Sequence, residues 1–146
     1  MYDARSRYLA DTVATVGSER LLTMLYDRML LDVERAEAAQ RAGDRVEGTA
    51  QLTHAQEILS ELIASLDVDS WDGGPGLMSI YTFLLSELIE ASTTADPDRT
   101  AACRGIIEPL REAWHGAADA VARTAAPAPP PAMTSTEALM GELGVG

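Results

Sequence analysis

The chain has no lysine. All 11 of its basic residues are arginine, and they face 23 acidic residues, which gives a net charge of −12 over 146 residues. A chain of this charge repels phosphate, so its composition argues against a general nucleic-acid binder and against a protein held on anionic lipid by charge. Hydrophobic residues nevertheless make up 47% of the chain. That fraction is ordinary for a globular domain and predicts a folded protein.

Cysteine, aromatic residues and long apolar runs are also scarce. Cys103 is the only cysteine and cannot form an intramolecular disulfide, and no basic, apolar leader opens the sequence, so we expect a cytoplasmic protein. Charges interrupt every apolar stretch before the ~20 residues that a membrane-spanning helix needs. Aromatic residues amount to 5%, whereas alanine and leucine abound. This balance predicts an all-α fold.

The first half of the chain contains signals for two helices. Gly17 and Ser18 are residue types that cap a helix, and they predict a first helix that continues to about residue 40. Asp44, with Glu47 three residues later, has the spacing of a capping box and predicts a second helix over 45–66.

The second half contains signals for two more. The segment 67–76, which reads DVDSWDGGPG, is rich in helix breakers and is predicted to be a loop before a third helix over 77–92. Asp96 before Pro97 suits the N-cap and the first position of a fourth helix. Pro109 stands inside that helix and removes the hydrogen bond to Gly105, so a kink is predicted between these two residues.

Short connections between four long helices predict an antiparallel four-helix bundle in a single domain. We expect the bundle to cover residues 17–124, after an N-terminal arm over 1–16. The segment 125–146 contains four of the seven prolines and is predicted to be a Pro-rich tail. The tail contains a small apolar group formed by Leu139, Met140 and Leu143. The tail is expected either to dock this group on the bundle or to be a mobile tether.

Few residues suggest chemistry. Glu112 and His115 have the Glu-x-x-His spacing of a di-metal bundle, but the second motif that such a site requires is missing, and His115 is read as a solvated residue near a helix end. His54 is expected at the surface or its boundary. Cys103 falls on the apolar seam of the fourth helix and is read as a small core residue rather than a nucleophile. We therefore expect no enzyme, no cofactor and no metal.

Apolar residues are more numerous than one buried helix face requires. The first predicted helix carries them on almost every side, and Tyr8, Leu9 and Val13 precede it. These side chains either complete the core, bind an amphipathic segment of another protein, or form the subunit interface of a dimeric regulatory bundle.

Several motifs, taken together and in their order along the chain, resemble those of one protein family. The run RYLADTVATVGSERLLTMLYDRML resembles the N-terminal signature of the flagellar export chaperone FliS family, in which a Tyr-Leu arm precedes a Leu-x-x-Met-Leu-Tyr-Asp core. The resemblance continues in AQEILSELIASLD over 55–67, in Tyr81 with Leu84 and Leu88, and in PLREAW over 109–114. It covers about residues 1–120. Gly17 and Ser18 replace the family's Ser-Pro pair, and the Pro-rich tail has no counterpart.

The resemblance implies a cytoplasmic chaperone that binds the disordered C-terminal segment of flagellin, prevents its premature polymerisation and delivers it to the flagellar type III export gate. It implies that the protein has no catalytic residue and that it is a monomer or a weak homodimer. The arm is expected to cover the client groove as a removable lid. The residues expected to bind the client or to form the lid are Tyr8, Leu9, Val13, Leu22, Leu25, Tyr26, Met29, Tyr81, Leu84 and Leu88.

Overall fold

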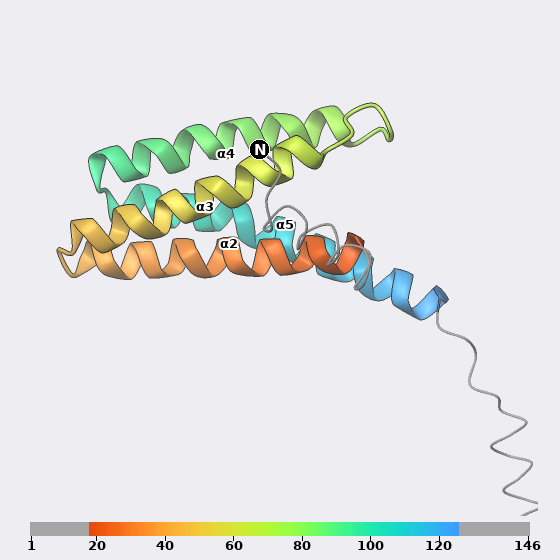
Figure 1. Cartoon of the computed structure of the whole chain (residues 1–146), viewed down its shortest axis with the longest axis horizontal. Coiled ribbons are helices and arrows are strands. Elements are labelled where there is room, and N and C mark those ends of the chain that lie inside the picture. The colour runs from red at the N-terminus through yellow and green to blue at the C-terminus, as the bar shows by residue number, and fades with distance from the viewer. Residues whose placement is uncertain (1–17, 126–146) are drawn as a thin grey trace, which may run out of the picture.

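The computed structural model describes residues 18–125, and they form four helices and no strand (Figure 1). The helices are α2 (Ser18–Arg41), α3 (Arg45–Ser65), α4 (Gly74–Thr94) and α5 (Pro97–Ala125). Each runs antiparallel to the one before it (Figure 1). The predicted all-α four-helix bundle is therefore confirmed. The predicted arm 1–16 and all but the first residue of the predicted tail lie outside the described residues.

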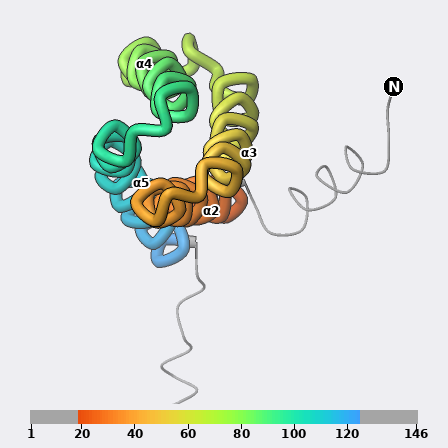
Figure 2. The backbone as a smooth tube through the Cα atoms, turned by 90° about the vertical axis from the view of Figure 1, so that its left-hand side faces the viewer, coloured from red at the N-terminus to blue at the C-terminus, as the bar shows by residue number. Residues whose placement is uncertain are grey.

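The helices form a closed square when viewed along the bundle (Figure 2). α2 packs against α3 and α5, and α4 packs against the same two helices, so α2 and α4 lie on opposite corners. The core between them is made of buried apolar side chains from every helix. Its members are Tyr26, Met29, Val33, Ala36, Leu52, Ala55, Ile58, Leu59, Leu62, Leu77, Tyr81, Leu84, Leu88, Ala91, Cys103 and Ile107.

Two predicted helix starts are confirmed by their capping bonds. The Asp44 carboxylate accepts a hydrogen bond from the Glu47 backbone N–H at 3.1 Å, and Gly43 before it takes a φ of +81°, which glycine adopts without strain. At α5, the Asp96 carboxylate accepts from the backbone N–H of Asp98 at 2.9 Å. The Glu47 side chain completes no capping box, because its carboxylate accepts a hydrogen bond from Gln51 instead.

The predicted start of the third helix is wrong by three residues. α4 begins at Gly74 rather than Leu77, and it ends at Thr94 rather than near Ser92. Pro75 lies in the first turn, where a helix needs no backbone N–H from it, so the apparent breakers are the beginning of the helix. The loop between α3 and α4 therefore covers only residues 66–73.

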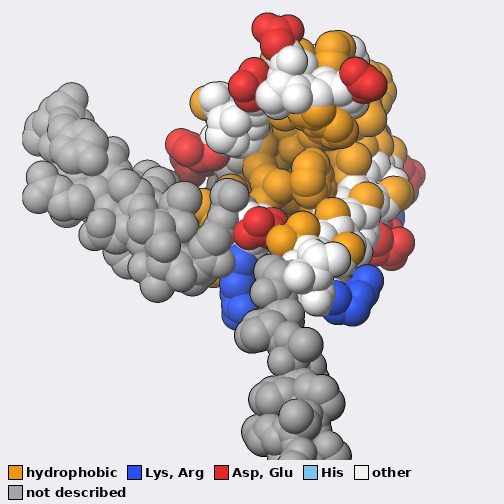
Figure 3. Space-filling view, turned by 90° about the vertical axis from the view of Figure 1, so that its right-hand side faces the viewer, with side chains coloured by type: hydrophobic (Ala, Val, Ile, Leu, Met, Phe, Trp, Pro, Cys, Tyr) orange, Lys and Arg blue, Asp and Glu red, His pale blue; other side chains and the backbone are white. Residues whose placement is uncertain are grey.

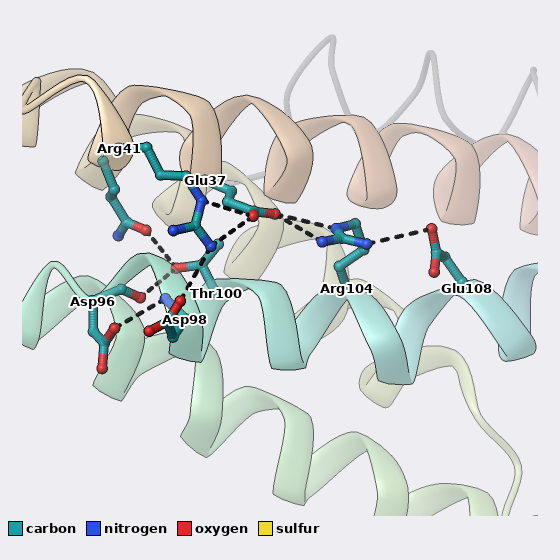
Figure 4. Close-up of polar contacts among 8 residues, drawn as sticks. Glu37, Arg41, Asp96, Asp98, Thr100, Arg104 and Glu108 are labelled. Carbon is teal, nitrogen blue, oxygen red and sulfur yellow. Dashed lines mark hydrogen bonds and ion pairs between the residues drawn. The ribbon is translucent and has the colours of Figure 1, made fainter.

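α5 continues as one helix through Pro109. Its N-terminal half is tied to α2 by polar side chains (Figure 4). Arg104 donates to Glu37 at 3.1 Å, Arg41 donates to Asp98 at 3.2 Å, and the Thr100 hydroxyl donates to Gln40 at 2.7 Å. These contacts fix the end of the bundle where α2 meets α3. The predicted kink between Gly105 and Pro109 stays a prediction.

No helix within residues 18–125 is long and apolar enough to span a membrane. Cys103 is fully buried, as expected of a small core residue, and burial raises the pKa of its thiol to about 12. A thiol in this state is not a nucleophile at neutral pH. The prediction that Cys103 belongs to the core is confirmed.

Candidate functional site

A groove of about 1000 Å³ runs along α3 and is bordered by α2 and α4. We call it the α3 groove. Its lining residues come from three helices: Leu21, Leu25 and Arg28 of α2, then Thr53, His54, Gln56, Glu57, Ile58, Ser60, Glu61 and Ser65 of α3, then Leu85 and Ile89 of α4. A volume of this size can take the side chains of a bound peptide segment.

Four of the five apolar residues that line the groove form two pairs, each with its members one helical turn apart. Leu21 and Leu25 line the α2 border, and Leu85 and Ile89 line the α4 border. Residues four apart on a helix lie on the same face, so each pair forms a short apolar strip along its border. The α3 side chains between the strips are mostly polar. The groove therefore offers apolar contacts beside polar groups that stay hydrated, which suits an amphipathic segment.

A buried carboxylate positions two polar side chains of the groove. Asp32 of α2 is fully buried, and it accepts hydrogen bonds from Arg28 at 2.9 Å and from His54 of α3. Both partners are partly exposed and line the groove. A buried carboxylate needs such partners to offset its lost hydration. His54 lies at the surface boundary, as predicted, and the contact with Asp32 holds it there.

A second apolar region is hollowed into the end of the bundle where α2 and α4 begin (Figure 3). The loop 66–73 lies at this end and carries Trp71, which is exposed. Trp71 meets Trp114 of α5 edge-on with ring centroids 6.4 Å apart, and Trp114 stacks on Tyr26 of α2 at 6.5 Å. The same loop carries exposed Asp67, Asp69 and Asp72. Apolar rings and carboxylates thus lie together at this end.

The residues predicted to bind a client lie at different depths. Tyr26, Met29, Tyr81, Leu84 and Leu88 belong to the buried core. Leu22 and Leu25 are half-buried and pack against that core, and Leu25 also lines the α3 groove. Tyr8, Leu9 and Val13 lie outside the described residues. Within residues 18–125, only Leu22 and Leu25 of the predicted set are part of the accessible surface.

Sequence reasoning did not assign Leu21, Leu85 and Ile89 to the site. All three belong to helices that also carry core residues, and Ile89 is 47% exposed. The available signal was the four-residue spacing of Leu85 and Ile89 beside the core positions Leu84 and Leu88. A helix with apolar residues on two adjoining sides must expose one of them.

The surroundings of His115 differ from the prediction. Its ring is not simply solvated, because Nε2 lies 2.7 Å from the carboxylate of Asp27 on α2, which also accepts from Arg111 at 2.6 Å. Burial alone would raise the pKa of Asp27, but the hydrogen bonds from His115 and Arg111 outweigh it and lower the pKa. Among the described residues no three His, Cys, Asp or Glu side chains gather as a metal site would require.

The fold and this surface define an all-α four-helix bundle with a partly apolar groove along α3. A family model described as flagellar protein FliS matches residues 1–121, and the chain belongs to that family. It is thus a flagellar export chaperone of a family that binds flagellin in the cytoplasm and is not known for enzymes. No curated protein matches the chain.

Proposed function

We propose that the protein binds the C-terminal segment of flagellin, prevents its premature polymerisation and delivers it to the flagellar type III export gate. The α3 groove is the observation that carries the proposal, because it offers an apolar strip on each border and mostly polar α3 side chains between the two strips. Membership of the FliS family supports a client of this kind.

The shape of the groove suits a client that folds as it binds. A disordered amphipathic segment loses chain entropy on docking, so only part of its contact energy remains as affinity. Apolar contacts with Leu25 and Ile89 are not directional. They therefore attract the client without requiring an exact hydrogen-bond partner for each of its polar groups. Moderate affinity of this kind allows release at the export gate.

The predicted site residues take two roles in this proposal. Leu22 and Leu25 contact the client, since they are the accessible members of the set within residues 18–125. The five core residues keep α2 and α4 at the positions that border the groove. Tyr8 and Leu9 of the arm compete with the client for apolar sites and act as a removable lid.

The groove is tested by one charge placed on its α4 strip. Ile89→Asp introduces a carboxylate where the client's apolar face docks, and we expect it to weaken binding of a flagellin C-terminal peptide about tenfold or more. Val46→Asp is the matched control, because Val46 is 82% exposed and does not line the groove. Calorimetric titration measures both affinities, and circular dichroism verifies that both variants fold. Equal affinities for the two variants would remove the groove from the proposal.

The lid is tested by shortening the arm. Removal of residues 1–15 should change the affinity for the same peptide, because the peptide then competes with nothing for the groove. Tyr8→Ala reports on the aromatic side chain alone, and a loss of about 1 to 3 kcal/mol is expected if Tyr8 also anchors the client. An unchanged affinity in the shortened protein would leave the arm without a lid function.

A further inference from the structure

A buried carboxylate holds the arginine that lines the α3 groove. Asp32 accepts a hydrogen bond from Nε of Arg28 at 2.9 Å and another from Nδ1 of His54. Within residues 18–125, Arg28 bonds to no partner other than Asp32, so its two Nη groups can bind a further acceptor. The Arg28 side chain is about half exposed and lines the groove. A guanidinium that is already held at Nε loses little freedom when Nη binds a ligand.

The carboxylates of the groove lie toward its other end. Arg28 and His54 meet at the same carboxylate of Asp32, so their polar groups lie at one level along the bundle. Glu57 and Glu61 follow His54 on α3, and both are exposed and line the groove. At 1.5 Å per residue they lie about 4.5 and about 10.5 Å nearer the end of α3.

The loop after α3 increases this asymmetry. It contributes three carboxylates, those of Asp67, Asp69 and Asp72, and contains no basic residue. The last turn of α3 contains no basic residue either. The electrostatic potential along the groove therefore becomes more negative from Arg28 toward Ser65, the last groove residue of α3.

A helix placed in this field has a favoured direction. Its N-terminus carries partial positive charge and unpaired N–H groups, and its C-terminus carries partial negative charge and unpaired carbonyl groups. With the C-terminus at Arg28, the carbonyl groups meet the Nη donors and the N–H groups lie beside carboxylates. The opposite direction would bring carbonyl groups to Glu61 and N–H groups to the guanidinium.

We propose that the α3 groove fixes the direction of the bound client. The client segment docks as a short helix antiparallel to α3, with its last carbonyl groups on Arg28 and its first turn beside Glu61. This inference rests on the proposed function, since it requires the client to occupy the groove. Arg28 contacts the client directly, and Asp32 positions the guanidinium.

A neutral acceptor suits Arg28 better than a carboxylate of the client. Asp32 already offsets the charge of the guanidinium, and Glu57 lies on the adjoining turns of α3. A full negative charge on the client would therefore gain little Coulomb attraction at this position. Directional hydrogen bonds from Nη to carbonyl oxygens remain available, because they do not depend on the net charge of the site.

Disulfide cross-linking of the full chain reads the direction. Thr53→Cys places a thiol at the Arg28 end of the groove, and Ser65→Cys places one at the loop end. Both positions are exposed, whereas the natural Cys103 is buried and does not compete. The probe is a flagellin C-terminal peptide of about 12 residues, which spans about 18 Å as a helix. It is chosen as one whose binding Ile89→Asp weakens, and it carries one cysteine at its first or its last position.

The two peptides should cross-link with opposite preferences. We expect the peptide with the last-position cysteine to react about fivefold faster with Thr53→Cys than with Ser65→Cys. The peptide with the first-position cysteine should prefer Ser65→Cys by a similar factor.

Affinity tests the contact at Arg28. Arg28→Gln should weaken binding of the same peptide, without cysteine and amidated at its C-terminus, by about threefold to tenfold. The amide removes the chain-terminal carboxylate, so the measured loss reports on carbonyl groups. Arg35→Gln changes the net charge equally at an exposed residue of α2 outside the groove and should leave the affinity unchanged. Circular dichroism verifies that both variants fold.

The outcomes separate this inference from the proposed function. Reversed or absent cross-linking preferences would overturn the direction and leave the groove as the client site. Equal affinities of Arg28→Gln and Arg35→Gln would remove the contact at Arg28. If no flagellin peptide loses affinity in Ile89→Asp, the groove is not the client site, and the proposed function and this inference fail together.

Discussion

The hydroxyl of Tyr26 on α2 hydrogen-bonds the hydroxyl of Tyr81 on α4. These helices occupy opposite corners of the bundle and do not pack against each other, so the two side chains connect them through the middle of the core. The pKa of Tyr26 is raised well above its ordinary value, mainly by burial and to a smaller extent by the hydrogen bond to Tyr81. Both hydroxyls therefore stay protonated at physiological pH.

Removal of both hydroxyls should cost less than the sum of the two single removals. Tyr81→Phe leaves the buried hydroxyl of Tyr26 without this partner, and we expect a loss of about 1 to 3 kcal/mol in the free energy of unfolding. The double variant with Tyr26→Phe should lose less than the sum of the two single changes. Urea unfolding of the four proteins gives the coupling energy. Strictly additive losses would show that the hydroxyls do not act as a pair.

Asp32 is expected to matter more than the side chains that bind it. Asp32→Asn weakens charge-assisted bonds at a fully buried site, and the free energy of unfolding should fall by about 1 to 3 kcal/mol. His54→Gln should cost less, because the His54 side chain remains partly hydrated. Thermal and urea unfolding measure both. A larger loss in the His54 variant would contradict this account.

Glu37 makes the contact between α2 and α5 depend on pH. Burial alone would raise its pKa, but hydrogen bonds from Arg41 and Arg104 hold it below the usual value (Figure 4). Its contribution is therefore complete above the unfolded-chain pKa of about 4.3 and is lost as pH falls through the lower folded pKa.

Replacement of the Glu37 carboxylate should lower the free energy of unfolding in a pH-dependent way. Glu37→Gln should lower the free energy of unfolding by about 1 kcal/mol at pH 7 and by much less near pH 2. Glu34→Gln, at an exposed position of the same helix, is the control and should change little at either pH. Urea unfolding at the two pH values provides the comparison. A constant difference between Glu37→Gln and wild type would exclude the ionic contribution.

The Cys103 thiol should be protected from reagents in the folded protein. Burial and a pKa raised to about 12 both keep the reactive thiolate scarce at pH 8. Labelling with a thiol reagent should be many times slower in buffer than in concentrated urea. Equal rates would mean that α5 opens readily around this residue.

Two glycines should respond to alanine in opposite directions. A Cβ at Gly116 of α5 meets open space, so Gly116→Ala should stabilise the protein by about 0.5 to 1 kcal/mol. A Cβ at Gly74 would lie 2.1 Å from the backbone oxygen of Val68, so Gly74→Ala must displace the loop before α4 and destabilise the fold. Melting temperatures of the two variants decide the matter, and shifts of the same sign would contradict it.

Local sequence signals accounted for most of the fold. Asp44 and Asp96 marked two helix starts because an N-cap side chain bonds to backbone only two or three residues away. The start of α4 was misjudged because Gly74 and Pro75 are read as breakers, although proline is acceptable in a first turn. Such errors arise where one residue type suits both a loop and a helix terminus.

The amino-acid sequence by itself determined that this protein is an acidic, all-α member of the FliS family, because charge, periodicity and capping are properties of neighbouring residues. Tertiary structure alone decided which apolar residues remain accessible. Tyr81 fills the core whereas Phe83, two positions later, faces outward, and Asp32 is buried beneath the rim of the α3 groove. Each of these outcomes depends on which side of a helix its neighbours cover, and helices distant along the chain settle that by packing.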